Sequence, residues 1–197
     1  ICLFIGGDPS PACTADTGFG FKGGIDELSI YHCAIRSAEV TSIFNAGIAG
    51  KLKQNATINT SSSVSIWQGE GNANDTRGAN NGAFAANTYA AGKVGQAFSL
   101  DGTDDSVDMG LVQSTQIFSL EAWVSPLSAV NDPINQELII GDGVTSIVVR
   151  KIGGVDRPVF QYRDSTLNAF EQTIGTNAIP LNTFTHLAGT YDGVTLR

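Results

Sequence analysis

Residues 92–110 read GKVGQAFSLDGTDDSVDMG, and this stretch decides the fold class. Apolar residues alternate with polar ones on both sides of a short polar segment: Phe98 and Leu100 precede it, and Val107 and Met109 follow it. Alternation with a period of two turns one face of a β-strand inward and the other outward. The polar segment, residues 101–106, contains one glycine and three aspartates, which favour a tight turn. We therefore predict a β-hairpin with one buried face, which further strands must cover.

The rest of the chain repeats this pattern of short apolar or alternating segments between turns rich in Gly, Asn and Asp. The further predicted strands are residues 1–7, 25–31, 64–67, 118–126, 137–140, 146–152, 159–163, 170–174 and 185–191. One helix interrupts them: Ser37 caps it, Val40, Ile43 and Phe44 share one face, and Gly47 ends it. This pattern predicts an all-β protein, an antiparallel β-sandwich with one short helix.

The composition limits the classes of function. The chain has 197 residues, of which 42% are hydrophobic and only 15% charged, and its net charge is −8. An acidic chain without clustered Lys and Arg is unsuited to nucleic acid or to an anionic membrane surface. It contains no run of about 18 apolar residues, so we predict no membrane span. The composition fits a soluble extracellular protein or one that holds cations.

Two features point to a cation on chemical grounds. Residues 68–82 (QGEGNANDTRGANNG) combine glycines with side-chain oxygens, and Ca²⁺ binds six to eight oxygens in such loops. The spacing differs from that of an EF-hand, and an Asn/Gly turn cluster is the alternative. Asp26 is predicted to share a strand face with Leu28 and Ile30, where an unpartnered carboxylate would be unfavourable. It therefore needs N–H donors, an arginine or a metal, unless it lies at the sheet rim in water.

Several segments resemble one known family. Residues 65–107, FSLEAWVSP at 118–126 and LNTFTHLAGTYDG at 181–193 resemble, in order, the opening and later strands of a bacterial laminin-G-like domain. FIGGDPS at 4–10 and FKGGIDELSIYHCAIRSAEVTSIFNAG at 21–47 resemble the closing part of the same domain. The resemblance implies a concanavalin A-like jelly roll, of the type found in lectins and glucanases.

The order of these parts differs from that of the family. We expect residues 1–47 to be the closing part of a laminin-G-like jelly roll, 48–63 a linker, and 64–197 the opening and middle part. Two explanations stay open: a fragment that spans two tandem repeats, or a circular permutant. The resemblance implies two further strands between Arg197 and Ile1 that have no counterpart here, so we expect unpaired strand edges that associate between molecules.

The resemblance also implies a bound calcium ion. It brings the closing strand near the opening loop, so that one ion would lie between Asp26 and Asp75, with further oxygens near Gly78, Asn80 and Asn81. We expect a structural calcium at these five residues. The residue pattern gives a separate reason to include Asp26, because a carboxylate at its predicted buried position needs a partner.

The family implies a non-catalytic binding or adhesion module of a secreted or surface protein, which recognises carbohydrate or another extracellular protein. The aromatic residues that are candidates for stacking on a sugar are Trp67, Tyr89, Trp123, Phe160 and Tyr162, although aromatic residues within strands more often belong to the core. A jelly-roll glycosidase is one alternative, but its paired carboxylates are not evident among six scattered glutamates. A passive spacer repeat is the other. We expect no enzymatic activity.

Overall fold

The computed structural model describes residues 2–9, 15–16, 20–50, 63–84, 88–112, 116–130, 136–164 and 169–197. Most of the predicted linker, residues 51–62, lies outside this part of the chain. The elements are β1 (Cys2–Ile5), β2 (Asp8–Pro9), β3 (Ala15–Asp16), β4 (Lys22–Tyr31), α1 (Ser37–Ala46), η2 (Gly47–Ala49), β5 (Ser63–Trp67), β6 (Ala83–Phe84), β7 (Tyr89–Ala91), β8 (Gln96–Asp101), β9 (Val107–Leu111), β10 (Phe118–Pro126), β11 (Gln136–Gly141), β12 (Thr145–Ile152), β13 (Val155–Asp164), β14 (Ala169–Ile174) and β15 (Thr185–Tyr191). The predicted strands and the predicted α-helix are confirmed, but the prediction that Ser37 caps the helix was wrong: Arg36 is the N-cap, and Ser37 is the first helical residue.

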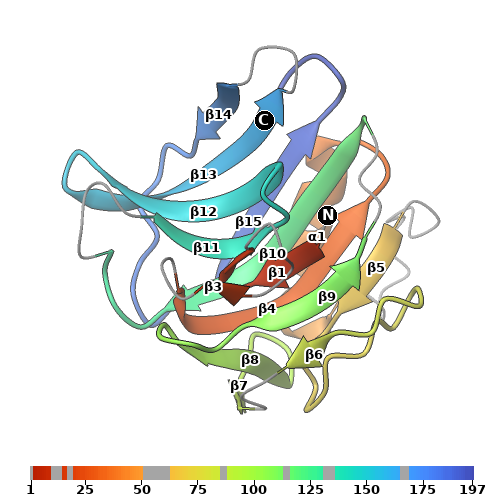
Figure 1. Cartoon of the computed structure of the whole chain (residues 1–197), viewed down its shortest axis with the longest axis vertical. Coiled ribbons are helices and arrows are strands. Elements are labelled where there is room, and N and C mark those ends of the chain that lie inside the picture. Colours follow the sequence, from red (N-terminus) through yellow and green to blue (C-terminus); the bar gives the residue numbers. More distant parts are fainter. Residues whose placement is uncertain are drawn as a thin grey trace.

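Two antiparallel sheets form the sandwich (Figure 1). The seven-stranded sheet has the order β14-β13-β12-β11-β1-β9-β6, and the six-stranded sheet has the order β15-β10-β4-β8-β7, with β5 also paired to β4. The main core lies between them and contains side chains from both, including Ile5, Leu28, Phe98, Met109 and Phe160. The predicted all-β antiparallel sandwich is therefore confirmed.

The stretch at residues 92–110 is not a hairpin, and this prediction was wrong. β8 pairs with β4 and β7 in the six-stranded sheet, whereas β9 pairs with β1 and β6 in the seven-stranded sheet. The turn between them carries the chain from one sheet to the other. Phe98, Leu100, Val107 and Met109 are all buried because the two strands face each other across the core. Alternation correctly identified the buried faces, but it carries no information about the pairing partner.

The described strands of residues 1–47 are built into both sheets. β1 lies between β11 and β9, and β4 lies in the other sheet between β10 and β8. The part that resembles the end of the family domain and the part that resembles its beginning thus pack into one sandwich.

Helix α1 covers the outer side of the six-stranded sheet. Tyr31, Ile35 and Ile43 form a small apolar cluster there, separate from the main core. The ring of Phe44 on α1 stacks on Trp123 of β10 at a centroid distance of 5.7 Å. This packing explains why Trp123, although only 3% exposed, is absent from the cluster between the sheets.

A β-bulge in β4 separates Asp26 from its apolar neighbours. The register with β10 shifts between the pairs Trp123–Asp26 and Glu121–Ser29, and the inserted Glu27 has a φ of 51°. The extra residue reverses the alternation, so that Ile25, Leu28 and Ile30 all enter the core. Asp26 instead lies opposite Trp123, on the outer side. The prediction that Asp26 shares a face with Leu28 and Ile30 was therefore wrong.

Candidate functional site

The polar loop at residues 68–82 is organised around Asp75. One carboxylate oxygen accepts hydrogen bonds from the backbone N–H groups of Ile66, Arg77 and Gly78 at 2.9, 3.0 and 2.9 Å, and the other accepts one from Asn80 at 3.2 Å. Burial by itself would raise the pKa of Asp75, but the bonds from Gly78, Ile66 and Arg77 outweigh it and lower this pKa. The bond from Ile66 ties the loop to β5, and the other three bonds fold the loop around the carboxylate.

The two asparagines of the predicted site also serve the loop. Asn81 accepts a hydrogen bond from the backbone of Asp75 through its side-chain oxygen, and the backbone carbonyl of Asn80 accepts one from the Trp67 indole at 2.8 Å. The Asn80 amide donates to the Ser65 hydroxyl at 2.7 Å. The loop thus brings together four of the predicted ligands, Asp75, Gly78, Asn80 and Asn81. The side-chain oxygens of Asp75 and Asn81 accept hydrogen bonds from backbone N–H groups of the protein.

Within the described part of the chain, Asp26 has no hydrogen bond to this loop; its partner comes from residues 92–95 instead. It is fully buried, and one carboxylate oxygen accepts a hydrogen bond from the backbone N–H of Val94 at 2.8 Å. Its other oxygen, Oδ1, has no hydrogen-bond partner among the described residues. Burial is the largest cause of the change in the pKa of Asp26, which is raised from 3.8 to about 7. The hydrogen bond from Val94 opposes this rise, and the neighbouring charge of Glu27 adds to it.

The predicted calcium site stays a prediction, but these contacts show which of its carboxylates could accept a cation. The oxygens of Asp75 already receive four N–H donors, an arrangement that favours its charged form without a cation. Asp75 therefore does not fit the role of a ligand in this conformation, and the contacts of the described residues give it no partner in common with Asp26. Asp26 does fit, because a buried oxygen without a hydrogen bond and a raised pKa are what a bound cation would relieve.

A second acidic group lies on the turn between β8 and β9. Asp101, Asp104 and Asp105 are the one group of three possible metal ligands that come close enough together within the described part of the chain. These side chains are largely solvent-accessible, and two of them stabilise the turn: Asp105 accepts a bond from the backbone of Asp101, and Asp101 one from Thr103. They act here as turn residues.

The structure separates the candidate sugar-stacking aromatics by exposure. Trp67, Trp123 and Phe160 are no more than 5% exposed and pack within the protein. Tyr89 and Tyr162 are half-buried, and Tyr162 stacks on Tyr191 at a centroid distance of 4.9 Å. Three of the five candidates are therefore core residues rather than a stacking surface.

The outer face of the seven-stranded sheet carries a polar network that connects four strands. By register, Gln136, Arg150, Gln161 and Gln172 of four neighbouring strands lie on this face. The Arg150 guanidinium donates to Gln172 at 3.1 Å, to Gln136 at 2.7 Å and to Gln161 at 3.3 Å. Gln161 donates in turn to Ser146 at 2.9 Å. No sequence pattern predicted this network, because its members are spread over residues 136–172 and only contacts across strands bring them together.

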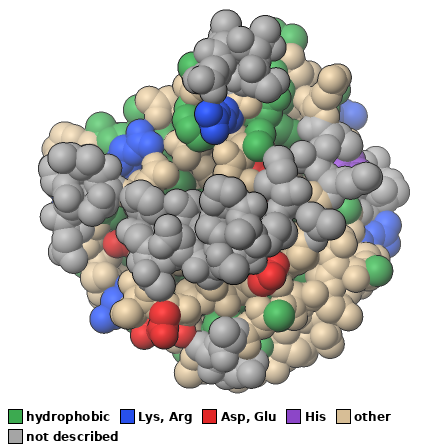
Figure 2. All heavy atoms as spheres, viewed as in Figure 1, with side chains coloured by type: hydrophobic (Ala, Val, Ile, Leu, Met, Phe, Trp, Pro, Cys, Tyr) green, Lys and Arg blue, Asp and Glu red, His purple; other side chains and the backbone are tan. Residues whose placement is uncertain are grey.

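An aromatic and a basic side chain border the network. The Arg163 guanidinium lies 5.8 Å from the ring centre of Phe170, which is 50% exposed, and both share the face of Arg150 by register. Figure 2 shows the molecule from the same side as Figure 1, with Lys and Arg side chains (blue) beside hydrophobic ones (green) near the top. We call Gln136, Arg150, Gln161, Arg163, Phe170 and Gln172 the outer-face cluster.

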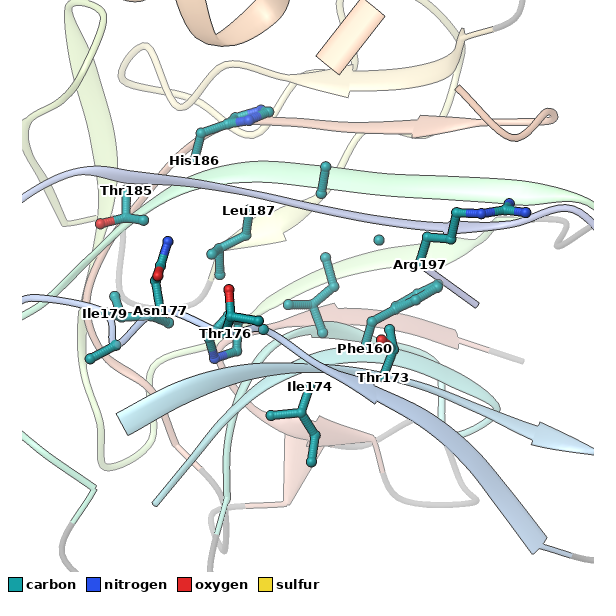
Figure 3. A pocket seen from close by; sticks show the side chains of 16 residues that line it. Phe160, Thr173, Ile174, Thr176, Asn177, Ile179, Thr185, His186, Leu187 and Arg197 are labelled. Carbon is teal, nitrogen blue, oxygen red and sulfur yellow. The ribbon is translucent and has the colours of Figure 1, made fainter. Parts of the chain in front are cut away.

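A cleft of about 310 Å³ opens between the edge strands β14 and β15 (Figure 3). Phe160, Ile179 and Leu187 form an apolar floor, and Thr176 and Asn177 lie at its border. Beside it, the backbone of Arg197 exchanges two hydrogen bonds with Thr190, at 2.8 and 2.9 Å. The backbone N–H and C=O of Thr190 therefore point away from β10. Because every second residue of a strand points these groups to the same side, those of His186 and Ala188 also point away from β10.

Two further carboxylates lie outside these sites: Glu137 of β11, which is half-buried, and Glu121, which lies on the outer side of β10 with Tyr31. Burial, and to a lesser extent the charge of Asp156, raise the pKa of Glu137 from 4.5 to about 7. A backbone hydrogen bond from Lys22 acts in the opposite direction. Glu121, fully buried on β10, bonds His186 at 2.7 Å and accepts a bond from the Tyr31 hydroxyl at 3.0 Å. Neither Glu137 nor Glu121 lines the cleft.

Residues 101–197 match the family model Laminin_G_3, the concanavalin A-like lectin/glucanases superfamily. We assign this part of the chain to that superfamily, and the two antiparallel sheets of the whole chain agree with its jelly-roll fold. The resemblance inferred from the sequence is thereby confirmed over residues 101–197. Neither the search of curated proteins nor the search of solved structures gives a match. No described helix is long and apolar enough to cross a membrane.

Proposed function

We propose that this chain is a non-catalytic binding module of a secreted or cell-surface protein, and that it recognises carbohydrate through the outer-face cluster. The observation that carries the proposal is the guanidinium of Arg150 held among three glutamine side chains on four neighbouring strands. Concanavalin A-like domains include lectins, which supports a sugar ligand by analogy.

The chemistry of the cluster suits a polyhydroxylated ligand. A glutamine amide both donates and accepts hydrogen bonds, as a sugar hydroxyl does, and Gln172 is exposed. Phe170, also exposed, supplies an apolar ring of the kind that packs against the C–H face of a sugar. Because strands fix these side chains in a sheet, little ordering is needed when a ligand binds.

A protein ligand is the second candidate, supported by the position of β15 at the edge of the six-stranded sheet as described. Backbone groups directed outward from β15, next to an apolar cleft, suit an extended segment that adds one strand to the sheet. Ala188→Pro would remove an outward N–H without breaking the ladder to β10. We expect it to abolish such binding, and to leave carbohydrate binding by the outer-face cluster unchanged.

We also propose a structural calcium ion, centred on Asp26 rather than shared with Asp75. The unpartnered oxygen of Asp26 supports it, and a bound cation would hold this carboxylate in its charged form. The test is thermal melting in excess calcium or in chelator at pH 8, with Asp26→Asn and Asp75→Asn compared. Calcium should raise the midpoint of the parent and of Asp75→Asn but not of Asp26→Asn; an unchanged parent midpoint would refute the ion.

A glycan panel tests the carbohydrate proposal. The purified chain should bind at least one polysaccharide in affinity electrophoresis and release no reducing sugar from it. Gln172→Ala should weaken the binding at least fivefold, whereas Gln96→Ala, which changes an exposed glutamine of β8 in the other sheet, should not. Binding to none of the glycans would refute the proposal, and release of reducing sugar would show an enzyme.

A further inference from the structure

The outer edge of β15 carries the start of a further β-ladder. Thr190 and Arg197 exchange two backbone hydrogen bonds, at 2.8 and 2.9 Å, in an antiparallel arrangement that the next pair of residues continues. Further along β15, the N–H and C=O groups of Ala188 and His186 point to the same side as those of Thr190. In the sheet as described, no strand pairs with them there. The edge thus offers an extended segment the backbone groups of a ladder that has already begun.

The cleft lies where the side chains of such a segment would enter. Residues directly opposite each other on neighbouring strands point to the same face of a sheet. Leu187 of β15 lines the cleft, and Gly189 lies against the ring of Phe160. Figure 3 shows Leu187 across the cleft from Phe160 and Thr176. Side chains opposite Leu187 and Gly189 would therefore enter this cleft of about 310 Å³, whose floor is apolar.

Hydrogen bonds fix the wall of the cleft that faces β15. The backbone N–H of Gly175 donates to the carbonyl of Pro158 at 2.8 Å, and that of Ile179 donates to the carbonyl of Asp156 at 2.9 Å. The Arg157 guanidinium also donates to the carbonyl of Gly175, at 3.3 Å. Because the wall is already held in place, a ligand that enters the cleft needs to order little of the protein.

From this arrangement we infer that β15 binds an extended peptide segment of another protein, which runs antiparallel to β15 and has apolar side chains at alternate positions. The apolar side chains enter the cleft opposite Leu187 and Gly189, and the intervening residues exchange backbone hydrogen bonds with His186 and Ala188. This inference rests on the proposed protein-binding candidate and names the chemistry of its partner. It is independent of carbohydrate binding by the outer-face cluster.

A second copy of the chain suits the cleft less well than a peptide. If two β15 strands paired with each other, each Leu187 would stay in its own core, and neither copy would bring a side chain into the cleft of the other. A peptide that belongs to no sheet has one whole face available for the cleft. The apolar floor therefore favours a peptide as the occupant.

The experiment compares three short synthetic peptides by fluorescence anisotropy. In the first peptide, leucine alternates with threonine and lysine. The second contains the same residues in an order without alternation. The third repeats the first but carries N-methyl groups on the residues between the leucines, which removes the N–H groups that would face β15. The parent should bind the first peptide at least about tenfold more tightly than either of the others.

Variants locate the site. Ala188→Pro removes an outward N–H from β15 and should weaken binding of the alternating peptide at least about fivefold. Ala178→Trp places a large ring at the exposed border of the cleft and should weaken it without changing the ladder. Circular dichroism checks that each variant is folded, and Ala178→Trp keeps the test decisive if Ala188→Pro unfolds.

Ala91→Pro is the matched control for the proline substitution. β7 lies at the other end of the described order of the same sheet, and Ala91 is exposed. Gly92 donates to Gly95, and Thr88 accepts a bond from Ser99, so the N–H of residue 91 between them points away from β8. Ala91→Pro should change the affinity for the alternating peptide by less than about twofold.

The outcomes separate this inference from the candidate on which it rests. Equal binding of the first two peptides, still lost in Ala188→Pro, would overturn the apolar partner and keep strand addition at β15. Binding that survives N-methylation and both cleft variants would overturn the inference, and binding of no peptide would overturn the protein-binding candidate as well. If sedimentation velocity shows self-association that the alternating peptide does not reduce, a second copy occupies the edge and the inference is overturned.

Discussion

Replacing Asp26 by Asn is expected to stabilise the protein above about pH 7 when calcium is absent. Asp26 is fully buried, and its Oδ1 has no hydrogen-bond partner among the described residues. Burial is the main cause of the rise in its pKa from 3.8 to about 7. The carboxylate is therefore unfavourable in the folded protein at neutral pH, whereas asparagine has the same shape and no charge.

The sign and size of the effect follow from linkage. Between pH 3.8 and about pH 7 the folded state holds more protons than the unfolded state, so stability falls as pH rises through this window. A shift of about three pKa units corresponds to about 4 kcal/mol, fully lost above pH 7. In Asp26→Asn the amide oxygen keeps the bond from Val94, but the new N–H₂ group faces no described acceptor, which costs about 1–3 kcal/mol. We expect a net gain of about 1–3 kcal/mol at pH 8 and none at pH 4.5.

Urea unfolding measures this difference, with the fluorescence of the buried Trp67 and Trp123 as the signal and chelator in every sample. Glu137 also has a raised pKa of about 7, so Glu137→Gln serves as the matched variant whose contribution should add independently. If Asp26→Asn lost as much stability between pH 4.5 and pH 8 as the parent does, the reasoning about Asp26 would be refuted.

Three other changes test the remaining parts of the structure. Asp75→Ala should lower the free energy of unfolding by about 3 kcal/mol at pH 7, because it leaves four backbone donors without their acceptor. Since the folded pKa of Asp75 is lowered, this loss should shrink in urea titrations as the pH falls below about 4, and a loss independent of pH would contradict the assignment. Gly189→Ala should lower stability by about 1–3 kcal/mol, because a Cβ there would lie 2.5 Å from the Phe160 ring; an unchanged melting temperature would show that the two sheets separate easily. Finally, β14 and β15 end the two sheets as described, which predicts association that grows with protein concentration, and Ala188→Pro should reduce it in sedimentation velocity. A parent that stays monomeric at all practical concentrations would exclude such pairing.

Much of the fold follows from local sequence alone. Strands such as residues 118–126 and 185–191 were predictable because alternating apolar residues favour a half-buried strand wherever the strand lies. The helix at Ser37–Ala46 was predictable from its apolar spacing and its terminal glycine. These signals depend on near neighbours in the sequence. The family resemblance of residues 65–107, 118–126 and 181–193 then predicted the type of sandwich, and the family model matches residues 101–197.

The candidate site could be predicted only in part. The loop around Asp75 was found because asparagines, aspartate and glycines adjoin in the sequence, but its four N–H donors depend on how the loop meets β5. The outer-face cluster was missed, because a glutamine or arginine in a strand resembles any solvated side chain until its neighbours across the sheet are known.

The sequence by itself determined which residues turn inward, and tertiary structure decided what they meet. Phe98 and Met109 alternate as buried residues must, yet only the ladders to β4 and β1 show that they belong to different sheets. The bulge at Glu27 likewise moves Asp26 to the outer side, although the pattern of the strand placed it with Leu28. Alternation is a property of one strand, whereas pairing and bulges arise from hydrogen bonds between segments far apart in the chain, which no local pattern encodes.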